Sequence, residues 1–256
     1  MFFDTHAHYD DKRFDGDRDA LLGAMRESGV SLILNAGSSV ESSRRGLALA
    51  DKYPFIYAAV GVHPHDAMRM DEGSVPEMRC LLKHPKAAAV GEIGLDYHYN
   101  FSPPDVQKSR FREQLELARE LGASVIIHER EAFEDVMNIL SDYRGVRGVF
   151  HCFSGGWDAA KRVLDMGDKN WMLSFTGVIT FKSARAALET AARVPLDRLM
   201  LETDAPYLSP EPARGGRNDS RNLSHIARCL AAARGIGTET LAEAALLNGK
   251  KFFGIP

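Results

Sequence analysis

Cysteine and long apolar runs are both scarce in this chain. Its 256 residues include only three cysteines (Cys80, Cys152 and Cys229), and no two of them form a C-x-x-C pair. Such a sparse, odd set favours free thiols in a reducing compartment over a disulfide framework. No segment approaches the roughly 20 consecutive apolar residues that a membrane helix needs, and the start, MFFDTHAHYD, lacks the basic leader and apolar stretch of a secretion signal. We therefore expect a cytoplasmic protein that does not contact a membrane.

Neither sign of charge dominates the sequence. Lys and Arg number 32 against 35 Asp and Glu, which leaves a formal net charge of -3. This balance argues against a protein that coats nucleic acid through bulk positive charge, but it leaves open an enzyme that grips a few phosphates locally. No Gly-rich dinucleotide fingerprint follows the first apolar run, which disfavours an open doubly wound sheet.

Short apolar runs alternate with segments of helical periodicity along the whole chain. The expected strands are Phe2–Thr5, Ser31–Asn35, Ile56–Gly61, Ala87–Gly91, Ala123–Ile127, Val146–Phe150, Trp171–Ser174 and Leu199–Glu202. The expected helices are Arg18–Ser28, Glu41–Lys52, Gly73–Leu82, Val106–Leu121, Ala132–Ser141, Trp157–Met166, Ser183–Arg193, Leu223–Arg234 and Thr240–Phe253. Because alternating strands and helices imply parallel strands and right-handed crossovers, the pattern predicts an α/β protein, a single (β/α)8 TIM barrel over residues 1–256.

Polar residues with metal-binding side chains follow the predicted strands. Six of the nine histidines lie at such strand ends, as do one glutamate and one aspartate. They are His6 and His8 after the first strand, His63 and His65 after the third, Glu92 after the fourth, His128 after the fifth, His151 after the sixth and Asp204 after the eighth. Because active sites of such barrels are built where the carboxyl ends of the strands meet, the set predicts a metal centre, although any one histidine alone is more often structural.

The spacing of the set indicates how metals would be held. His6 and His8 are two residues apart, which puts both imidazoles on one face of an extended chain. Imidazole suits zinc, whereas carboxylates suit magnesium and manganese, so a mixed set leaves Mg²⁺, Mn²⁺ and Zn²⁺ open. A carboxylate shared by two ions fits a two-metal hydrolase site. Glu92, between the two histidine groups in the chain, is the candidate bridge.

The ordered motifs resemble those of the TatD family of metal-dependent deoxyribonucleases, which are amidohydrolase-type barrels. The matching stretches are DTHAH at 4–8, GVHPH at 61–65, GEIGLDY at 91–97, QLELARELG ending at Gly122, IIH at 126–128, HCFSG at 151–155, SFTG at 174–177 and LETDAPYL at 201–208. The resemblance implies that His6, His8, Glu92 and Asp204 hold one divalent ion and that Glu92, His128 and His151 hold a second. It also implies Mg²⁺-dependent hydrolysis of DNA, with 3′–5′ exonuclease activity in some members.

On this basis we expect a hydrolase in which a metal-activated water attacks a phosphodiester of DNA, single-stranded or at a 3′ end. Glu92 and Asp204 are the expected catalytic residues, with Asp204 as the candidate general base. The expected substrate contacts are His63, His65, Arg130, Lys182 and Arg217. Arginine suits phosphate because its charge-assisted hydrogen bonds match phosphate geometry.

Two segments depart from common family patterns and bear on the substrate. Glu129 follows His128 where a serine is frequent, and Asp219-Ser220 stands where many members have Glu-Pro. Two other functions remain alternatives. The same two-metal site would also suit hydrolysis of an amide, a lactone or an aminoacyl ester, and the barrel would also suit a non-catalytic nucleic-acid-binding protein.

Overall fold

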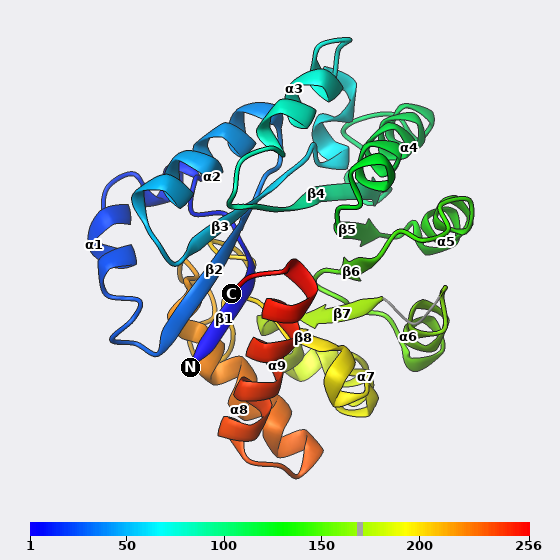
Figure 1. The fold of residues 1–256 in the computed structure, drawn as a ribbon. Coiled ribbons are helices and arrows are strands. Elements are labelled where there is room, and N and C mark those ends of the chain that lie inside the picture. Colours follow the sequence, from blue (N-terminus) through cyan, green and yellow to red (C-terminus); the bar gives the residue numbers. More distant parts are fainter. Residues whose placement is uncertain (168–170) are drawn as a thin grey trace. The chain divides into compact units, whose positions relative to one another are not determined.

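A computed structural model describes residues 1–167 and 171–256 of the chain. The strands are β1 (Phe2–Ala7), β2 (Val30–Ala36), β3 (Ile56–Val60), β4 (Ala87–Asp96), β5 (Val125–Arg130), β6 (Gly148–Phe150), β7 (Met172–Phe175) and β8 (Leu199–Leu201). The α-helices are α1 (Arg18–Gly23), α2 (Val40–Lys52), α3 (Ser74–Leu81), α4 (Pro104–Leu121), α5 (Phe133–Ser141), α6 (Trp157–Leu164), α7 (Arg185–Arg193), α8 (Leu223–Arg234) and α9 (Thr238–Phe253). The strands follow one another in chain order, β1 to β8, which is the order in a (β/α)8 barrel (Figure 1).

The chain divides into two compact units. The first unit comprises Met1–Asn35, Cys152–Leu164 and Met172–Pro256, and the second comprises Ala36–His151 and Asp165–Trp171. Among the helices of the described residues, we find none that combines the length and the apolar character needed to cross a membrane.

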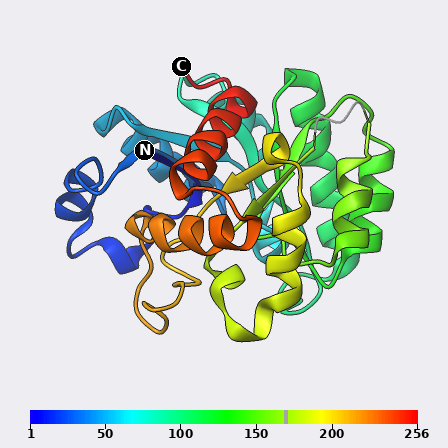
Figure 2. The ribbon, with the colours of Figure 1, turned by 90° about the horizontal axis from the view of Figure 1, so that it is seen from below.

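In the first unit, the C-terminal helix packs against the N-terminal strand. α9 packs against β1 and β8, and α8 contacts both α7 and α9 (Figures 1 and 2). Ala7, the last residue of β1, forms a parallel bridge with Ala205, just beyond β8. This bridge brings the carboxyl ends of the first and last strands together.

In the second unit, β3, β4, β5 and β6 form consecutive parallel pairs. α2, α3 and α4 cover this part of the sheet, and a buried apolar cluster lies between them, with Leu47, Val60, Met78 and Leu117 among its members. α4 ends at Leu121 and is followed by Gly122, whose φ of 62° is the left-handed conformation of a helix C-cap.

The expected positions of the strands and helices are confirmed. The largest differences in length are five residues each, at α1, which ends at Gly23 and not at Ser28, and at β4. This strand was expected to end at Gly91 but continues to Asp96, because it pairs with β5 as far as Asp96 and Arg130. Glu92 therefore lies within the strand and not after it. β1 and β5 are likewise longer than expected and include His6 and His128.

Candidate metal sites

The first unit brings His6, His8 and Asp204 together, and we call these three residues the β1 ligand group. The Nε2 atoms of His6 and His8 are 3.1 Å apart. Asp204 Oδ1 lies 3.3 Å from His8 Nε2 and 3.7 Å from His6 Nε2. His6 is fully buried, and the side chains of His8 and Asp204 are only 12% and 14% exposed, so a bound ion would be largely shielded from solvent.

Backbone hydrogen bonds between the two chain ends set this geometry. The amide of Asp204 donates to the carbonyl of His6 at 2.9 Å, and the amide of His8 donates to the carbonyl of Ala205 at 2.7 Å. Asp204 has a φ of 58°, a left-handed conformation that aspartate adopts more readily than most residues. The chain thus turns at the residue whose carboxylate faces the two imidazoles.

Asp4 lies in the same strand, two residues before His6, and is fully buried. Its carboxylate accepts hydrogen bonds from the Thr203 amide (2.9 Å), the Thr203 hydroxyl (2.5 Å) and the Ser220 hydroxyl (2.6 Å). Burial raises the pKa of Asp4 to about 7, although these donors pull the pKa in the opposite direction. Asp4 therefore binds the segment before Asp204 to β1. Its hydrogen bonds hold the backbone that carries Asp204 next to the strand that carries His6.

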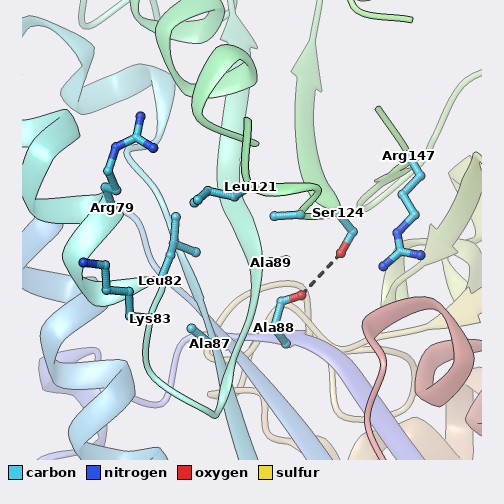
Figure 3. Close-up of a pocket in the computed structure, with 10 residues that line it drawn as sticks. Arg79, Leu82, Lys83, Ala87, Ala88, Ala89, Leu121, Ser124 and Arg147 are labelled. Atoms are coloured by element: carbon cyan, nitrogen blue, oxygen red, sulfur yellow. Dashed lines mark hydrogen bonds between the residues drawn. The ribbon is translucent and has the colours of Figure 1, made fainter. Parts of the chain in front are cut away.

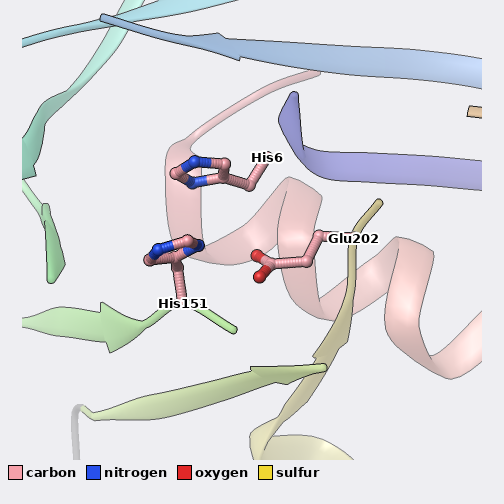
Figure 4. A group of neighbouring side chains, drawn as sticks. All are labelled: His6, His151 and Glu202. Atoms are coloured by element: carbon pink, nitrogen blue, oxygen red, sulfur yellow. The ribbon is translucent and has the colours of Figure 1, made fainter. Parts of the chain in front are cut away.

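Glu202 is a buried carboxylate outside the set of ligands expected from the sequence. Its Oε1 accepts a hydrogen bond from the Cys152 amide at 2.5 Å. A carboxylate oxygen of Glu202 also lies within 4.8 Å of an imidazole nitrogen of His6, and Figure 4 shows both side chains. The signal was present in the sequence, since Glu202 is in the LETD stretch directly after β8 and two residues before Asp204.

The second unit brings Glu92, His128 and His151 together, and we call these three the β4 ligand group. Glu92 Oε1 lies 2.8 Å from His128 Nδ1 and 2.8 Å from His151 Nε2. The two imidazole nitrogens are 3.3 Å from each other. His63 is a further neighbour, with Nε2 at 3.5 Å from the same glutamate oxygen, and His63, Glu92 and His128 also have the mutual spacing of metal ligands.

Glycines allow the strands that carry this group to approach closely. A Cβ on Gly91, next to Glu92, would lie 2.7 Å from the Cβ of Ile126 on β5. Gly94 has a φ of 145°, and a Cβ there would collide with the backbone carbonyl of His128. The glycines of the GEIG stretch are therefore required for the pairing that sets Glu92 beside His128.

Asp96, at the end of β4, holds two of the histidines. Its Oδ2 lies 3.0 Å from His128 Nε2 and 2.9 Å from His65 Nε2, and its Oδ1 accepts from the Tyr99 amide at 2.8 Å. Burial opposes ionisation, but these bonds outweigh it and hold the pKa of Asp96 well below its usual range. Burial also lowers the pKa of His128, yet its bonds to Asp96 and Glu92 raise this pKa above the usual value. Asp96 thus orients His128 with Nδ1 facing Glu92.

His63 differs from His128 in the direction of its pKa shift. Burial, followed by the neighbouring His128, lowers the pKa of His63 well below its usual value. Its Nδ1 accepts a hydrogen bond from the His65 amide at 3.1 Å, so Nε2 is the nitrogen directed at Glu92. His63 is therefore neutral at physiological pH and suited to a ligand or hydrogen-bonding role beside the β4 group.

Both ligand groups have the spacing of a metal shell. Nitrogen and oxygen ligands about 2.0–2.2 Å from a shared ion lie roughly 3–3.5 Å from one another. The separations are 2.8–3.3 Å in the β4 group and 3.1–3.7 Å in the β1 group. Each group mixes imidazole with a carboxylate, which suits zinc, manganese or magnesium. The residues present therefore fit divalent ions.

Comparison with known proteins agrees with this chemistry. Residues 3–254 match the model of the family described as TatD related DNase. The chain belongs to this family. Membership confirms the prediction of an enzyme, a metal-dependent hydrolase.

Two relatives and one solved structure illustrate the TatD likeness. The chain is 38% identical over 257 residues to YabD of Bacillus subtilis, an uncharacterized metal-dependent hydrolase, with 100% of both chains covered. It is 34% identical over 259 residues to the 3′-5′ ssDNA/RNA exonuclease TatD of Musicola paradisiaca, covering 98% of this chain and 97% of that protein. The crystal structure of YjjV, a TatD homolog from Escherichia coli, matches with a TM-score of 0.93 at 31% identity, covering 100% of this chain and 98% of that one. The fold class, a (β/α)8 TIM barrel, is thereby confirmed.

The structure also places the residues at which the chain departs from common TatD patterns. Glu129 Oε1 accepts from the Ala132 amide at 2.8 Å, so this carboxylate closes the turn before α5, and burial raises its pKa. Asp219 caps a short 3-10 helix and pairs with Arg221 at 2.7 Å. Ser220 is fully buried and holds Asp4 through its hydroxyl. All three departures have a structural role in this chain.

The cations expected to contact substrate lie in different surroundings. Arg130 is exposed at the end of β5, with its guanidinium 4.8 Å from the centre of the Tyr99 ring. Arg217 forms a two-bond ion pair with Asp17, at 2.8 and 2.6 Å. Lys182 is exposed at the start of a 3-10 helix before α7. Their roles, and those of His63 and His65, stay predictions.

A cavity at the opposite end of β4 is not a candidate for this chemistry. It measures about 260 Å³ and is lined by Ala87–Ala89 and Ser124, with Arg79 and Arg147 among the other residues (Figure 3). Glu92 lies five residues further along β4 than Ala87, which is roughly 16 Å in an extended strand. The cavity is therefore remote from the β4 ligand group.

Proposed function

We propose that this chain is a divalent-metal-dependent nuclease that hydrolyses phosphodiester bonds of single-stranded nucleic acid, DNA in particular, from the 3′ end. The observation that carries the proposal is the position of Glu92 Oε1, which lies 2.8 Å from an imidazole nitrogen of both His128 and His151. The Musicola relative is named as a 3′-5′ ssDNA/RNA exonuclease, which supports this substrate class and polarity.

We assign the ligands as the family resemblance implies. One ion is held by His6, His8, Glu92 and Asp204, and a second by Glu92, His128 and His151, with Mg²⁺ as the expected metal and Mn²⁺ or Zn²⁺ as alternatives. When bound, such ions lower the pKa of a coordinated water, polarise a phosphoryl oxygen and neutralise charge on the leaving oxygen.

The residues of the chain supply the remaining steps. Asp204, whose side chain is 14% exposed in the β1 group, is the proposed acceptor of the proton released from the attacking water, a role that typically contributes about 10²–10⁴-fold to rate. In the second unit, the proposed contacts of the scissile phosphate or of the adjacent phosphate are His63, His65 and Arg130. Lys182 and Arg217 are proposed contacts in the first unit, and for Arg217 this requires release from Asp17.

The direct test uses metal-stripped protein and a labelled substrate. We expect a 3′-labelled single-stranded oligonucleotide to lose its label with added Mg²⁺ or Mn²⁺, while a 5′-labelled one shortens progressively. EDTA should abolish both reactions. Nitrophenyl acyl esters and lactones, assayed beside them, should react far more slowly.

Two variants locate the activity. E92A should lower activity more than a hundredfold and reduce bound metal, because it removes the oxygen that both histidines face. E189A, which removes an exposed glutamate of α7, is the matched control and should behave as the parent protein. Nuclease activity that survives EDTA, or E92A with parental rate and metal content, would overturn the proposal. Preferential cleavage of the acyl esters would replace it with the alternative hydrolase.

A further inference from the structure

Two large aromatic side chains are exposed on the loop between β4 and α4. The rings of Tyr99 and Phe101 stack with their centroids 5.4 Å apart and an interplanar angle of 19°. Tyr99 is 50% exposed and Phe101 is 64% exposed. Large aromatic rings usually lose most of their surface on folding, because each buries 150–250 Å² of mainly apolar area. A ligand that covers the two rings when it binds would explain why this stacked pair is exposed to solvent.

The loop holds these rings in a defined position. Asp96 Oδ1 accepts a hydrogen bond from the Tyr99 amide at 2.8 Å. The buried hydroxyl of Ser102 donates to the carbonyl of His65 at 2.9 Å, and Gln107 Nε2 donates to the carbonyl of Ser102 at 2.7 Å. Residues on both sides of the ring pair are thus anchored, so ordering the loop costs little when a ligand binds.

A cation and an imidazole complete the surface. The Arg130 guanidinium lies 4.8 Å from the centroid of the Tyr99 ring, and it has no carboxylate partner among the residues that the structure describes. His65 meets both rings edge-on, at 5.3 Å from Tyr99 and 4.8 Å from Phe101. We call Tyr99, Phe101 and Arg130 the Phe101 platform.

The platform is connected directly to the β4 ligand group. His65 Nε2 lies 2.9 Å from Asp96, and the same aspartate oxygen lies 3.0 Å from His128, which faces Glu92. Contacts thus run from Phe101 through His65 and Asp96 to His128. All these residues belong to the second unit.

We propose that the Phe101 platform binds a nucleobase of the single-stranded substrate, which extends the Tyr99–Phe101 stack, while Arg130 pairs with an adjacent phosphate. The inference rests on the nuclease function proposed above and adds the residues that hold the strand. Stacked aromatic rings beside a free cation are the combination by which proteins bind single strands with little sequence preference, since every base has a π-face. A duplex keeps its bases inside the stack, so the platform favours unpaired ends.

Binding is tested without hydrolysis, in EDTA, with a short single-stranded oligonucleotide that carries 2-aminopurine, whose fluorescence is quenched on stacking. We expect the parent protein to quench the fluorescence of the probe and F101A to lose this quenching. The Kd of F101A for the oligonucleotide should be about tenfold higher, a loss of about 1.4 kcal/mol of binding free energy, which is within the range measured for one stacked base. F101W should restore both, and Y99A should resemble F101A. L247A, which removes an exposed leucine of α9, is the matched control and should leave Kd unchanged.

A second arm links the platform to turnover. With metal present, the parent protein should have a lower KM for a normal oligonucleotide than for one of equal length with abasic residues, and F101A should lose this preference with little change in kcat. The proposal for the platform would be overturned if F101A and Y99A both had the Kd and the quenching of the parent protein. It would also be overturned if the parent protein did not quench the probe. Absence of any metal-dependent cleavage by the parent protein would instead overturn the nuclease proposal, so the two failures are distinguishable.

Discussion

The Asp96 carboxylate lies 3.0 Å from Nε2 of His128, and this contact decides which nitrogen of the imidazole faces Glu92. A histidine that donates one ring N–H to a carboxylate presents its other nitrogen as a lone pair, which is how metal-binding histidines are commonly oriented. Asp96 also contacts His65 at 2.9 Å, so one buried carboxylate positions both a proposed metal ligand, His128, and a proposed substrate contact, His65.

D96N should therefore weaken metal binding without unfolding the protein. Because the neutral amide no longer favours the tautomer that His128 needs, we expect Kd for Mn²⁺ to rise about 10–100-fold, measured by calorimetry on metal-stripped protein. D135N is the matched control, since Asp135 binds the Tyr97 hydroxyl at 2.7 Å and Lys108 but none of the ligands. Equal Mn²⁺ affinities in D96N and the parent protein would show that Asp96 does not orient His128.

Asp4 is expected to contribute to stability more than to chemistry. D4A leaves three buried donors of Thr203 and Ser220 without their acceptor, and we expect the free energy of unfolding to fall by about 3–5 kcal/mol. S220A removes one of these donors and should cost about 1–2 kcal/mol. Urea unfolding of the metal-stripped proteins measures both. A D4A loss no larger than that of S220A would contradict this interpretation.

The stability of the metal-stripped protein should depend on the charge of Asp4. Burial raises the pKa of Asp4 in the folded state to about 7, well above the ordinary value of 3.8 for an aspartate. The folded state then binds the proton more tightly than the unfolded state, so the contribution of this group is largest at low pH and declines as the pH rises toward about 7. D4N should lack this decline, and melting temperatures between pH 5 and 8 measure it. Parallel curves for D4N and the parent protein would refute the prediction.

Gly94 should tolerate no side chain. G94A puts a Cβ against the backbone carbonyl of His128 at a φ of 145°, so we expect a loss of about 3 kcal/mol in unfolding free energy from strain and overpacking, together with weaker metal binding. The comparison is G122A, where φ is also positive but nothing lies within 4 Å of the added Cβ. Its cost should be about 1 kcal/mol. Similar losses in the two variants would mean that the contact with β5 is unimportant.

Strand and helix positions were largely predictable because each element carries its own periodicity. α8 has the expected bounds, Leu223–Arg234, and α4 ends at Leu121 as expected. β4 was underestimated because Glu92 and Asp96 are polar residues inside a strand. Contacts with other segments hold them there: the Glu92 amide donates to the carbonyl of Gly37, and Asp96 pairs with Arg130 of β5. Local pattern cannot reveal such a segment, since its burial comes from a neighbouring strand.

The candidate ligands were predictable as a set, but their supporting residues were not. His6, His8 and Asp204 lie together in one unit, and Glu92, His128 and His151 lie together in the other. Their role as metal ligands stays a prediction. The orienting role of Asp96 and the nearness of Glu202 to His6 depend on side-chain directions that spacing alone does not specify.

The sequence by itself determined the alternation of strands and helices, the family and the list of residues able to bind metal, because these follow from local composition and ordered motifs. The tertiary structure decided which atoms face one another. It directs His128 Nδ1 toward Glu92. It hydrogen-bonds Asp4 to Thr203, next to the turn at Asp204. It also stacks Tyr99 on Phe101, with Arg130 beside the Tyr99 ring. The physical reason is that these contacts join residues on different strands and loops. The local sequence does not favour one rotamer or tautomer of these side chains, and close packing and hydrogen bonding in the folded protein stabilise one of them.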